Sequence, residues 1–265
     1  MRINKIHLKK TRNMRDLGGL PVESGKTIKR GKLIRSGRLY KLPTKTIDAL
    51  HEMKVDTVVD LRLDKEIEGR PPAMLKGATY YSIPLVCTAT PGITTGNSMA
   101  GTMHKESKRI KEEFGTAENY MISMYKFILF EPESQSKLKF IFDLLLKEEN
   151  CIVWNCNSGK DRTGIVAMLI EGVLGVDREL IIADYMATKR IQRRRRRWQR
   201  FGMRLVPAFY GFKKLLYALM DAKPEYIIGA IDEIDARYGS IAGYVKEALG
   251  VTDDEIEILK QKYLE

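Results

Sequence analysis

One short stretch carries the side chains that could do chemistry. Cys156 and Arg162 are separated by five residues, within the run Cys-Asn-Ser-Gly-Lys-Asp-Arg-Thr-Gly at 156–164. A cysteine thiolate is a strong nucleophile, and a guanidinium can hold two phosphate oxygens in a fork. We therefore expect a loop in which the sulfur of Cys156 lies beneath a bound phosphate and Arg162 closes over it.

The flanking residues predict the elements that position this loop. The apolar run Cys151–Trp154 precedes it and the apolar run Ile165–Ile170 follows it, so we expect a strand, a loop and a helix. Backbone N–H groups and a helix N-terminus would then surround one point, where an anion binds readily. The same positive field lowers the pKa of a thiol from its usual ~8.5 and favours the thiolate.

Each loop residue has an expected role. Gly159 allows the tight turn, and the Thr163 hydroxyl is placed to support the thiolate when it leaves. A cysteine after a strand is often only a core residue, but the surrounding pattern favours the catalytic interpretation. The residues expected to contact substrate besides Cys156 and Arg162 are Asn157, Ser158, Gly159, Lys160, Thr163 and Gly164.

Residues 156–164 resemble the Cys-x-x-Gly-Lys-Asp-Arg-Thr-Gly loop of the bacterial atypical tyrosine phosphatases, which are similar to dual-specificity and phosphoinositide phosphatases. The resemblance implies a Cys-based phosphatase fold with a helical lid. It also implies activity on phosphotyrosine, phosphoserine or phosphothreonine proteins and on phosphoinositides. One residue departs from the family pattern, because Asn155 stands where a histidine normally precedes the cysteine. An amide can brace the loop but carries no charge.

Further segments resemble the family. Residues 13–19 read Asn-Met-Arg-Asp-Leu-Gly-Gly, and residues 31–38 end in Arg-Ser-Gly-Arg. The resemblance implies that Asn13, Arg15 and Arg35 support the phosphate loop, although each could instead be a turn cap or a surface charge. The Asp-Leu-Arg at 60–62 is followed by an acidic residue, Glu66, as in the family.

The reaction needs a general acid, and the chain has no Trp-Pro-Asp run to provide one. Asp161 is the first candidate because it lies within the loop, and its alternative role is to brace the loop. Asp60 is the second candidate, but a role as salt-bridge partner for nearby arginines is favoured. Lys160 is expected to contact additional phosphates on an inositol ring, or else to pair with a nearby acid.

The composition is typical of a globular protein. The 265 residues are 44% hydrophobic and 30% charged, and we expect one phosphatase domain over 1–265. The three cysteines and three histidines lack metal-ligand spacing, so we expect no disulfide framework, no metal and no cofactor. The N-terminus lacks the apolar core of a signal peptide and no run is long enough to cross a membrane, so the expected location is cytoplasmic, with signal-independent export left open.

Alternating strand and helix patterns predict an α/β fold, with a mostly parallel sheet flanked by helices and a helical C-terminus. We expect strands near Leu33 and Ile34 and over 55–61, 78–85 and 151–156, and helices over 44–53, 117–130, 135–149 and 177–188. A long loop with one helical stretch is expected over 87–116. The tail from Pro224 is expected to be helical, with breaks at 238–240 and Gly250 and a capping box at 252–255.

The positive charge of the chain is concentrated in one window. Residues 185–220 contain eleven Lys and Arg and no Asp or Glu, whereas the whole chain has a net charge of +12. An apolar stripe interrupted by Pro207 predicts two amphipathic helices, and we interpret 186–222 as a basic helical lid. The window could be a solvated face, a nucleic-acid site, or a surface that guides anionic substrates and membranes. We favour guidance, through Arg193–Arg197, and disfavour nucleic acid because no recognition motif accompanies the charge.

The sequence favours a metal-independent phosphatase with a phosphocysteine intermediate on Cys156. A phosphate-binding module that turns over weakly or not at all is the alternative, because Asn155 replaces the family histidine. Sulfur transfer through a Cys156 persulfide is a third hypothesis, which leaves the residues after Gly159 unexplained. The oligomeric state is not predicted.

Overall fold

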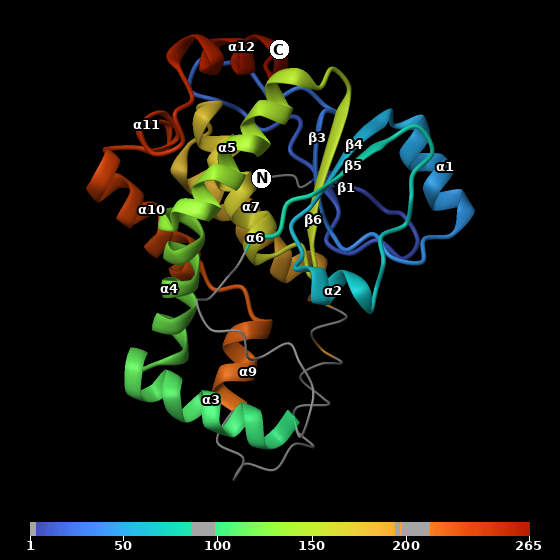
Figure 1. Cartoon of the computed structure of the whole chain (residues 1–265). Coiled ribbons are helices and arrows are strands. Elements are labelled where there is room, and N and C mark those ends of the chain that lie inside the picture. Colours follow the sequence, from blue (N-terminus) through green and yellow to red (C-terminus); the bar gives the residue numbers. More distant parts are fainter. Residues whose placement is uncertain (1–3, 86–98, 194–196, 198–212) are drawn as a thin grey trace.

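The computed structural model describes residues 4–85, 99–193, 197 and 213–265, with side chains described from residue 107 onward within the second range (Figure 1). The described part contains one six-stranded sheet in the order β1-β2-β3-β6-β4-β5. Its strands are β1 (Asn4–Lys5), β2 (Arg15–Asp16), β3 (Leu33–Gly37), β4 (Val55–Asp60), β5 (Thr79–Ser82) and β6 (Cys151–Cys156).

The centre of the sheet is parallel. Strand β6 pairs in parallel with β3 on one side and β4 on the other, and β5 pairs in parallel with β4. All six residues of β6 are buried, as expected for a central parallel strand that is covered on both faces. The short strands β1 and β2 extend the β3 edge with antiparallel pairing.

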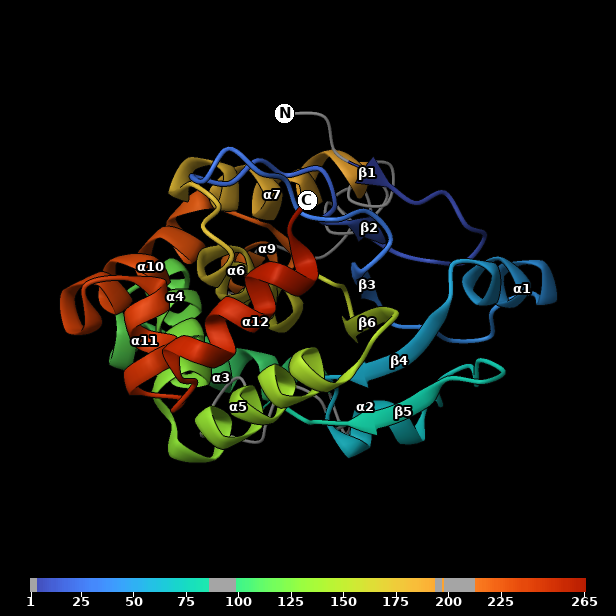
Figure 2. The ribbon, with the colours of Figure 1, turned by 90° about the horizontal axis from the view of Figure 1, so that it is seen from above.

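Helices cover both faces of this sheet. Figure 2 shows α1 (Thr44–Glu52) on one face and α6 (Asp161–Val173) on the other, among most of the remaining helices. The remaining described helices are α2 (Asp64–Glu68), α3 (Met99–Phe114), α4 (Ala117–Phe130), α5 (Pro132–Lys147), α7 (Arg178–Ile191), α9 (Lys213–Met220), α10 (Pro224–Tyr238), α11 (Ile241–Glu247) and α12 (Asp253–Tyr263).

The side chains of β6 divide between two hydrophobic cores. Ile152, Trp154 and Cys156 belong to the large core on the α6 side, whereas Cys151 and Val153 belong to the smaller core that includes Leu50 of α1. This alternation follows from the two-residue period of a strand. It places the Cys156 side chain on the same face of the sheet as α6, which the loop enters next.

The architecture confirms the predicted α/β Cys-based phosphatase fold. The expected strands and helices are present with boundaries shifted by a few residues, and the helical stretch expected within 87–116 is α3. The helical tail has its predicted breaks, and Thr252 and Glu255 form the predicted capping box at α12. Strands β1 and β2 and the one-turn helix α2 were not predicted, because two to five residues carry too little periodicity.

The expected lid lies partly outside the described residues. The first lid helix and the region around Pro207 fall there, while α9 covers the end of the second expected helix. Helix α9 packs against α4, beyond the end of the sheet where α2 also lies (Figure 1). None of the described helices combines the length and the apolar character needed to cross a lipid bilayer.

The packing of α6 against α11 generates a stability prediction. A Cβ added at Gly172 would lie 2.5 Å from Cγ2 and 2.7 Å from Cβ of Ile241. Alanine is the better helix former by about 1 kcal/mol, but overpacking against a stiff β-branched side chain costs about 1–3 kcal/mol. We expect Gly172→Ala to lower the free energy of unfolding, measured by urea denaturation. The control is Gly69→Ala, where the added Cβ meets nothing within 4 Å, and an equal effect of both changes would contradict the prediction.

Candidate active site

Strand β6 delivers Cys156 to the carboxyl edge of the parallel sheet. In the register of the sheet, Cys156 lies beside Gly37 of β3, and Asn155 lies beside Asp60 of β4. The chain then turns through residues 157–160 and begins α6 at Asp161. The carboxyl edge is where open α/β sheets bind ligands, and the N-terminus of α6 adds the positive end of a helix dipole there.

The loop requires glycine at its turn. Gly159 has a φ of 68°, and a Cβ at this position would lie 2.5 Å from the Gly37 nitrogen and 2.6 Å from the Ser36 carbonyl carbon. Both the left-handed backbone and the close approach to β3 exclude a larger residue. The predicted tight turn at Gly159 is therefore present.

Hydrogen bonds from outside the loop direct its carbonyl groups away from its centre. Gln192 Nε2 donates to the Ser158 carbonyl at 2.8 Å, and Asn13 Nδ2 donates to the Gly159 carbonyl at 2.6 Å. A planar trans peptide points its N–H opposite to its C=O, and the described chain has no cis peptide bond. The N–H groups of Gly159 and Lys160 therefore point inward, where they can bind an anion.

A buried ionic cluster lies behind the loop. Arg15 Nε lies 2.7 Å from Asp184 Oδ1, and Arg35 also bonds the Asp184 carboxylate and reaches the Gly159 carbonyl at 3.5 Å. Arg15 Nη1 donates to Asn13 Oδ1 at 2.9 Å, which fixes the amide that binds Gly159. The structure thus brings together the three residues predicted to support the loop, and it adds Asp184 from α7.

Two arginines and two acids make up this cluster. Burial raises the pKa of Asp184, but the charges and hydrogen bonds of Arg15 and Arg35 outweigh it and lower that pKa overall. Burial and the adjacent Asp184 carboxylate raise the pKa of Glu171 well above its ordinary value, which favours its neutral form. Arg15 and Arg35 thus share the Asp184 carboxylate, and the raised pKa of Glu171 disfavours a second negative charge beside them.

Arg162 is held in a fork by Glu66. Its Nη1 lies 2.6 Å from Oε2 and its Nη2 lies 3.0 Å from Oε1, and Nη1 also donates to the Leu61 carbonyl at 3.0 Å. Burial raises the pKa of Glu66, but the hydrogen bond and charge of Arg162 and the Leu63 N–H lower it overall. Glu66 is therefore ionised at neutral pH and orients the guanidinium.

Asp161 lies at the first position of α6, with partners on two sides. The Tyr125 hydroxyl donates to Oδ1 at 2.6 Å, and Lys160 Nζ lies 3.2 Å from the same oxygen. Burial and the Asp161 charge raise the pKa of Tyr125 well above its ordinary value, so Tyr125 is a neutral donor, and its hydroxyl also pairs with that of Tyr185 at 2.7 Å. The Asp161 side chain is 19% exposed and keeps access to solvent.

Lys160 connects the loop to α9. Its ammonium donates to the Leu219 carbonyl at 2.9 Å and to the Asp221 carbonyl, and the residue is 3% exposed. The nearby acid is Asp161, as the alternative role predicted. A contact between Lys160 and substrate stays a prediction, because its ammonium is already bonded to the carbonyls of Leu219 and Asp221, near the C-terminal end of the expected lid.

Asp60 has the contacts of a structural partner. Its buried carboxylate forms a fork with Arg62, with Nη2 at 2.6 Å from Oδ2 and Nε at 2.9 Å from Oδ1. The Tyr80 hydroxyl donates to Oδ2 at 2.6 Å. These contacts leave Asp60 little freedom to approach a leaving group at the loop.

Asn155 directly precedes Cys156 in β6, and Thr163 lies in the first turn of α6. The Asn155 amide is 1% exposed, and in the described part of the chain neither of its polar atoms has a hydrogen-bond partner. Among the described residues, no hydrogen bond from the Asn155 side chain braces the loop as expected. Thr163 is fully buried at the start of α6, its Oγ1 donates to the Ser36 carbonyl at 3.4 Å, and its carbonyl accepts from Trp154 Nε1 at 3.1 Å.

The two described cysteines have different surroundings. Cys151 lies at the start of β6, where burial and the charges of Asp16 and Asp56 raise the pKa of its thiol to about 12. Cys156 lies at the other end, where the strand runs into the loop. Cys151 is therefore an inert thiol and a matched control for Cys156.

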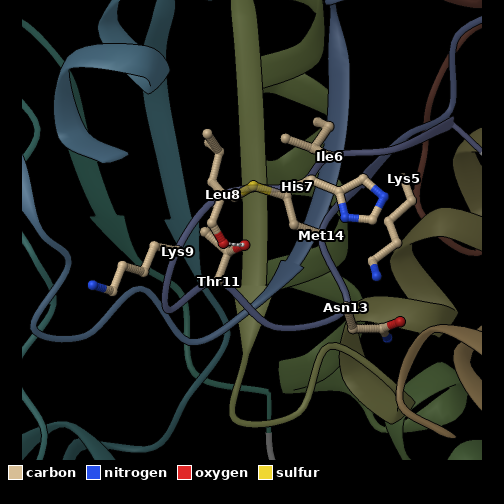
Figure 3. Close-up of a pocket in the computed structure, with 8 residues that line it drawn as sticks. All are labelled: Lys5, Ile6, His7, Leu8, Lys9, Thr11, Asn13 and Met14. Atoms are coloured by element: carbon tan, nitrogen blue, oxygen red, sulfur yellow. Dashed lines mark hydrogen bonds between the residues drawn. The ribbon is translucent and has the colours of Figure 1, made fainter. Parts of the chain in front are cut away.

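A cavity of about 300 Å³ lies along the N-terminal segment, and its lining residues are drawn in Figure 3. They run from Lys5 to Met14 and do not include residues 156–164. The cavity meets the loop only through Asn13, whose amide also binds Gly159. We therefore assign the chemistry to the loop.

Several supporting residues were missed from the sequence. Asp184 and Tyr125 lie in helices, and Gln192 directly follows α7. Nothing in the local sequence marks these three residues as different from their neighbours. Asp184 is distinguished by its burial and its ion pairs with Arg15 and Arg35, which become visible only in the fold.

The pattern of the tyrosine phosphatase family matches residues 6–265, and the chain belongs to this family and is a phosphatase. It is 27% identical over 258 residues to the triple specificity protein phosphatase PtpB of Mycobacterium tuberculosis, with 89% of this chain and 91% of the relative covered. It is 24% identical over 252 residues to a protein of Cupriavidus necator whose name assigns it provisionally to the tyrosine-protein phosphatases, with 95% of this chain and 85% of that protein covered.

The fork between Glu66 and Arg162 generates a kinetic prediction. Glu66→Gln keeps the shape of the side chain but weakens the fork, and we expect kcat for an aryl phosphate to fall about 10- to 100-fold. Because the pKa of Glu66 is lowered, its ion pair is complete at neutral pH and is lost as the pH falls through that pKa. The loss caused by the substitution should therefore shrink at acidic pH.

The matched control is Asp64→Asn on the same helix, where the residue is exposed. A Glu66→Gln variant as active as the Asp64→Asn variant would show that the fork does not position Arg162.

Proposed function

We propose that the protein hydrolyses phosphate monoesters through a phosphocysteine on Cys156. The observation that supports this proposal is the loop between Cys156 and Arg162, whose Ser158 and Gly159 carbonyls are held by outside donors and whose arginine is held by Glu66. These groups suit the charge on the equatorial oxygens of a phosphoryl group in transfer. They also supply the positive charge without a metal.

The proposed reaction has two steps. The Cys156 thiolate attacks phosphorus in line, a P–S bond forms, and the P–O bond to the leaving group breaks while Asp161 gives that oxygen a proton. A water then attacks phosphorus and gives a proton to Asp161, the P–S bond breaks, and inorganic phosphate leaves with Cys156 again a thiolate. Asp161 is supported in this role by its place at the loop and its partial exposure.

The proposed substrates are phosphotyrosine proteins, with phosphoserine and phosphothreonine proteins in addition, and phosphoinositides. The name of the mycobacterial relative, a triple specificity phosphatase, supports a range wider than phosphotyrosine. We also propose that 186–222 acts as a basic lid within a single domain and guides anionic substrates or an anionic membrane to the loop. Arg193 and Arg197, its described arginines within the run, are exposed.

The first test is phosphate release from a phosphotyrosine peptide and from a panel of phosphoinositides, with a chelator present. We expect turnover by the wild type and by Cys151→Ser, and its loss in Cys156→Ser. Retained binding of the peptide without turnover by the wild-type protein would instead support the phosphate-binding module. The unpartnered Asn155 amide is the observation that favours this second candidate.

The assignment of the acid generates a separate prediction. Because a general acid contributes about 10²- to 10⁴-fold, we expect Asp161→Asn to reduce phosphotyrosine turnover about 100-fold. An aryl phosphate with a strongly electron-withdrawing leaving group needs little protonation, and its turnover should fall less than tenfold. Asp60→Asn should instead destabilise the fold by about 3–5 kcal/mol, because it leaves Arg62 buried without its carboxylate. A leaving-group contrast in Asp60→Asn rather than Asp161→Asn would reassign the acid.

A further inference from the structure

A second group of arginines lies beside the phosphate loop, separate from Arg162. Arg12 precedes β2, Arg38 follows β3, and Arg62 and Arg70 flank α2. The mechanism above uses none of them directly.

Arg38 and Arg12 pack directly on the beginning of the loop. Arg38 Nη1 donates to the side-chain carbonyl of Asn157, the residue after the nucleophile. The Gly37 N–H donates to the Arg12 carbonyl at 2.7 Å, and a Cβ at Gly37 would lie 2.9 Å from Arg12 Cβ and 3.1 Å from the Ser158 carbonyl carbon. Arg38 therefore contacts Asn157 directly, whereas Arg12 packs beside Gly37, which also approaches Ser158.

The segment that carries Arg70 lies alongside them. Arg62 Nη1 donates to the Arg70 carbonyl at 2.8 Å, and the Ala73 N–H donates to the Leu39 carbonyl at 2.8 Å. The chain after α2 thus runs beside the residues that follow β3. This contact brings Arg70 near Arg38 from a different part of the sequence.

The charges of these arginines are not equally balanced. Arg62 is paired with Asp60, just as Arg162 is paired with Glu66. Burial, followed by the charges of Arg12, Arg70 and Arg62, lowers the pKa of Arg38 to about 10. The groups that act most strongly on Arg38 are therefore cations, and a bound anion would relieve this repulsion.

Lys160, by contrast, has its ammonium bonded to the carbonyls of Leu219 and Asp221 on the α9 side. A substrate with a second phosphate next to the scissile one needs a cation that faces the loop from outside. Arg38 is beside the loop because its guanidinium donates to the Asn157 side chain. A planar guanidinium also suits phosphate better than an ammonium does.

We propose that Arg38, with Arg12 and Arg70, forms a second anion subsite that binds another phosphate of a multiply phosphorylated inositol ring. The inference rests on the proposed function and narrows its substrate class. A ring suits the site because Arg38 touches the residue next to Cys156, so the two phosphates must be held close together by a compact scaffold. The ring can be a lipid headgroup or a soluble inositol phosphate.

The test compares Arg38→Gln with the wild type on three substrates: a phosphotyrosine peptide, a soluble inositol trisphosphate, and phosphatidylcholine vesicles that contain a phosphatidylinositol bisphosphate. Glutamine can still donate to Asn157 but has no charge. We expect KM for the trisphosphate and the bisphosphate to rise about tenfold or more, and kcat/KM for the peptide to change less than threefold. Arg30→Gln, in the exposed turn that precedes β3, is the matched control for net charge and should change none of them.

The arms separate the possible outcomes. A rise for the soluble and the lipid substrate alike assigns the subsite to the ring phosphate, and a rise for vesicles alone assigns it to the lipid surface and overturns the proposal as stated. Equal losses on all three substrates would show that Arg38 only braces the loop through Asn157, which also overturns it. Absence of turnover by the wild type on every substrate would refute the proposed function instead. In that case, binding of the trisphosphate to Cys156→Ser with and without Arg38→Gln, measured by calorimetry, still tests the subsite.

Discussion

The site depends on the direction of two peptide groups. The carbonyls of Ser158 and Gly159 point outward because Gln192 and Asn13 hold them there, and planarity then turns the following N–H groups inward. Without these donors the loop would present a mixture of carbonyl and N–H groups to a phosphate, and the carbonyls would repel it. The anion-binding character of the loop is therefore set by residues that never touch the anion.

The surrounding charges follow from the same requirement. Positive charge must be concentrated at the loop without unfolding the protein, and these four buried arginines are paired with acids in two ways. Arg162 and Arg62 have one carboxylate each, whereas Arg15 and Arg35 share Asp184. Two arginines that share one carboxylate favour an anion nearby. This arrangement is a physical reason to expect phosphate binding at the loop without the family histidine at position 155.

The prediction of the site from the sequence was strongest where the evidence was local. The strand that ends at Cys156, the turn at Gly159 and the helix from Asp161 are consecutive, and their patterns are strong. The supporting roles of Asn13, Arg15 and Arg35 came from resemblance alone, and their contacts to the loop were found only in the fold. The role of Lys160 was expected from its place in the loop, but the direction of its side chain depends on where α9 lies.

The sequence by itself was enough to predict the chemistry, because a cysteine, an arginine and a tight turn need only fixed spacing along one short segment to suggest a phosphatase loop. Only the tertiary structure decided which carboxylates and donors support that chemistry. Glu66 reaches Arg162 across 96 residues, and Arg15 reaches Asp184 across 169. Such pairs form when strands and helices distant in the chain meet at one edge of a sheet, and no local pattern selects one acid among the 34 in the sequence. The fold decides which acid pairs with each arginine, because a buried charge has lost its water and is stable only beside a partner of opposite charge.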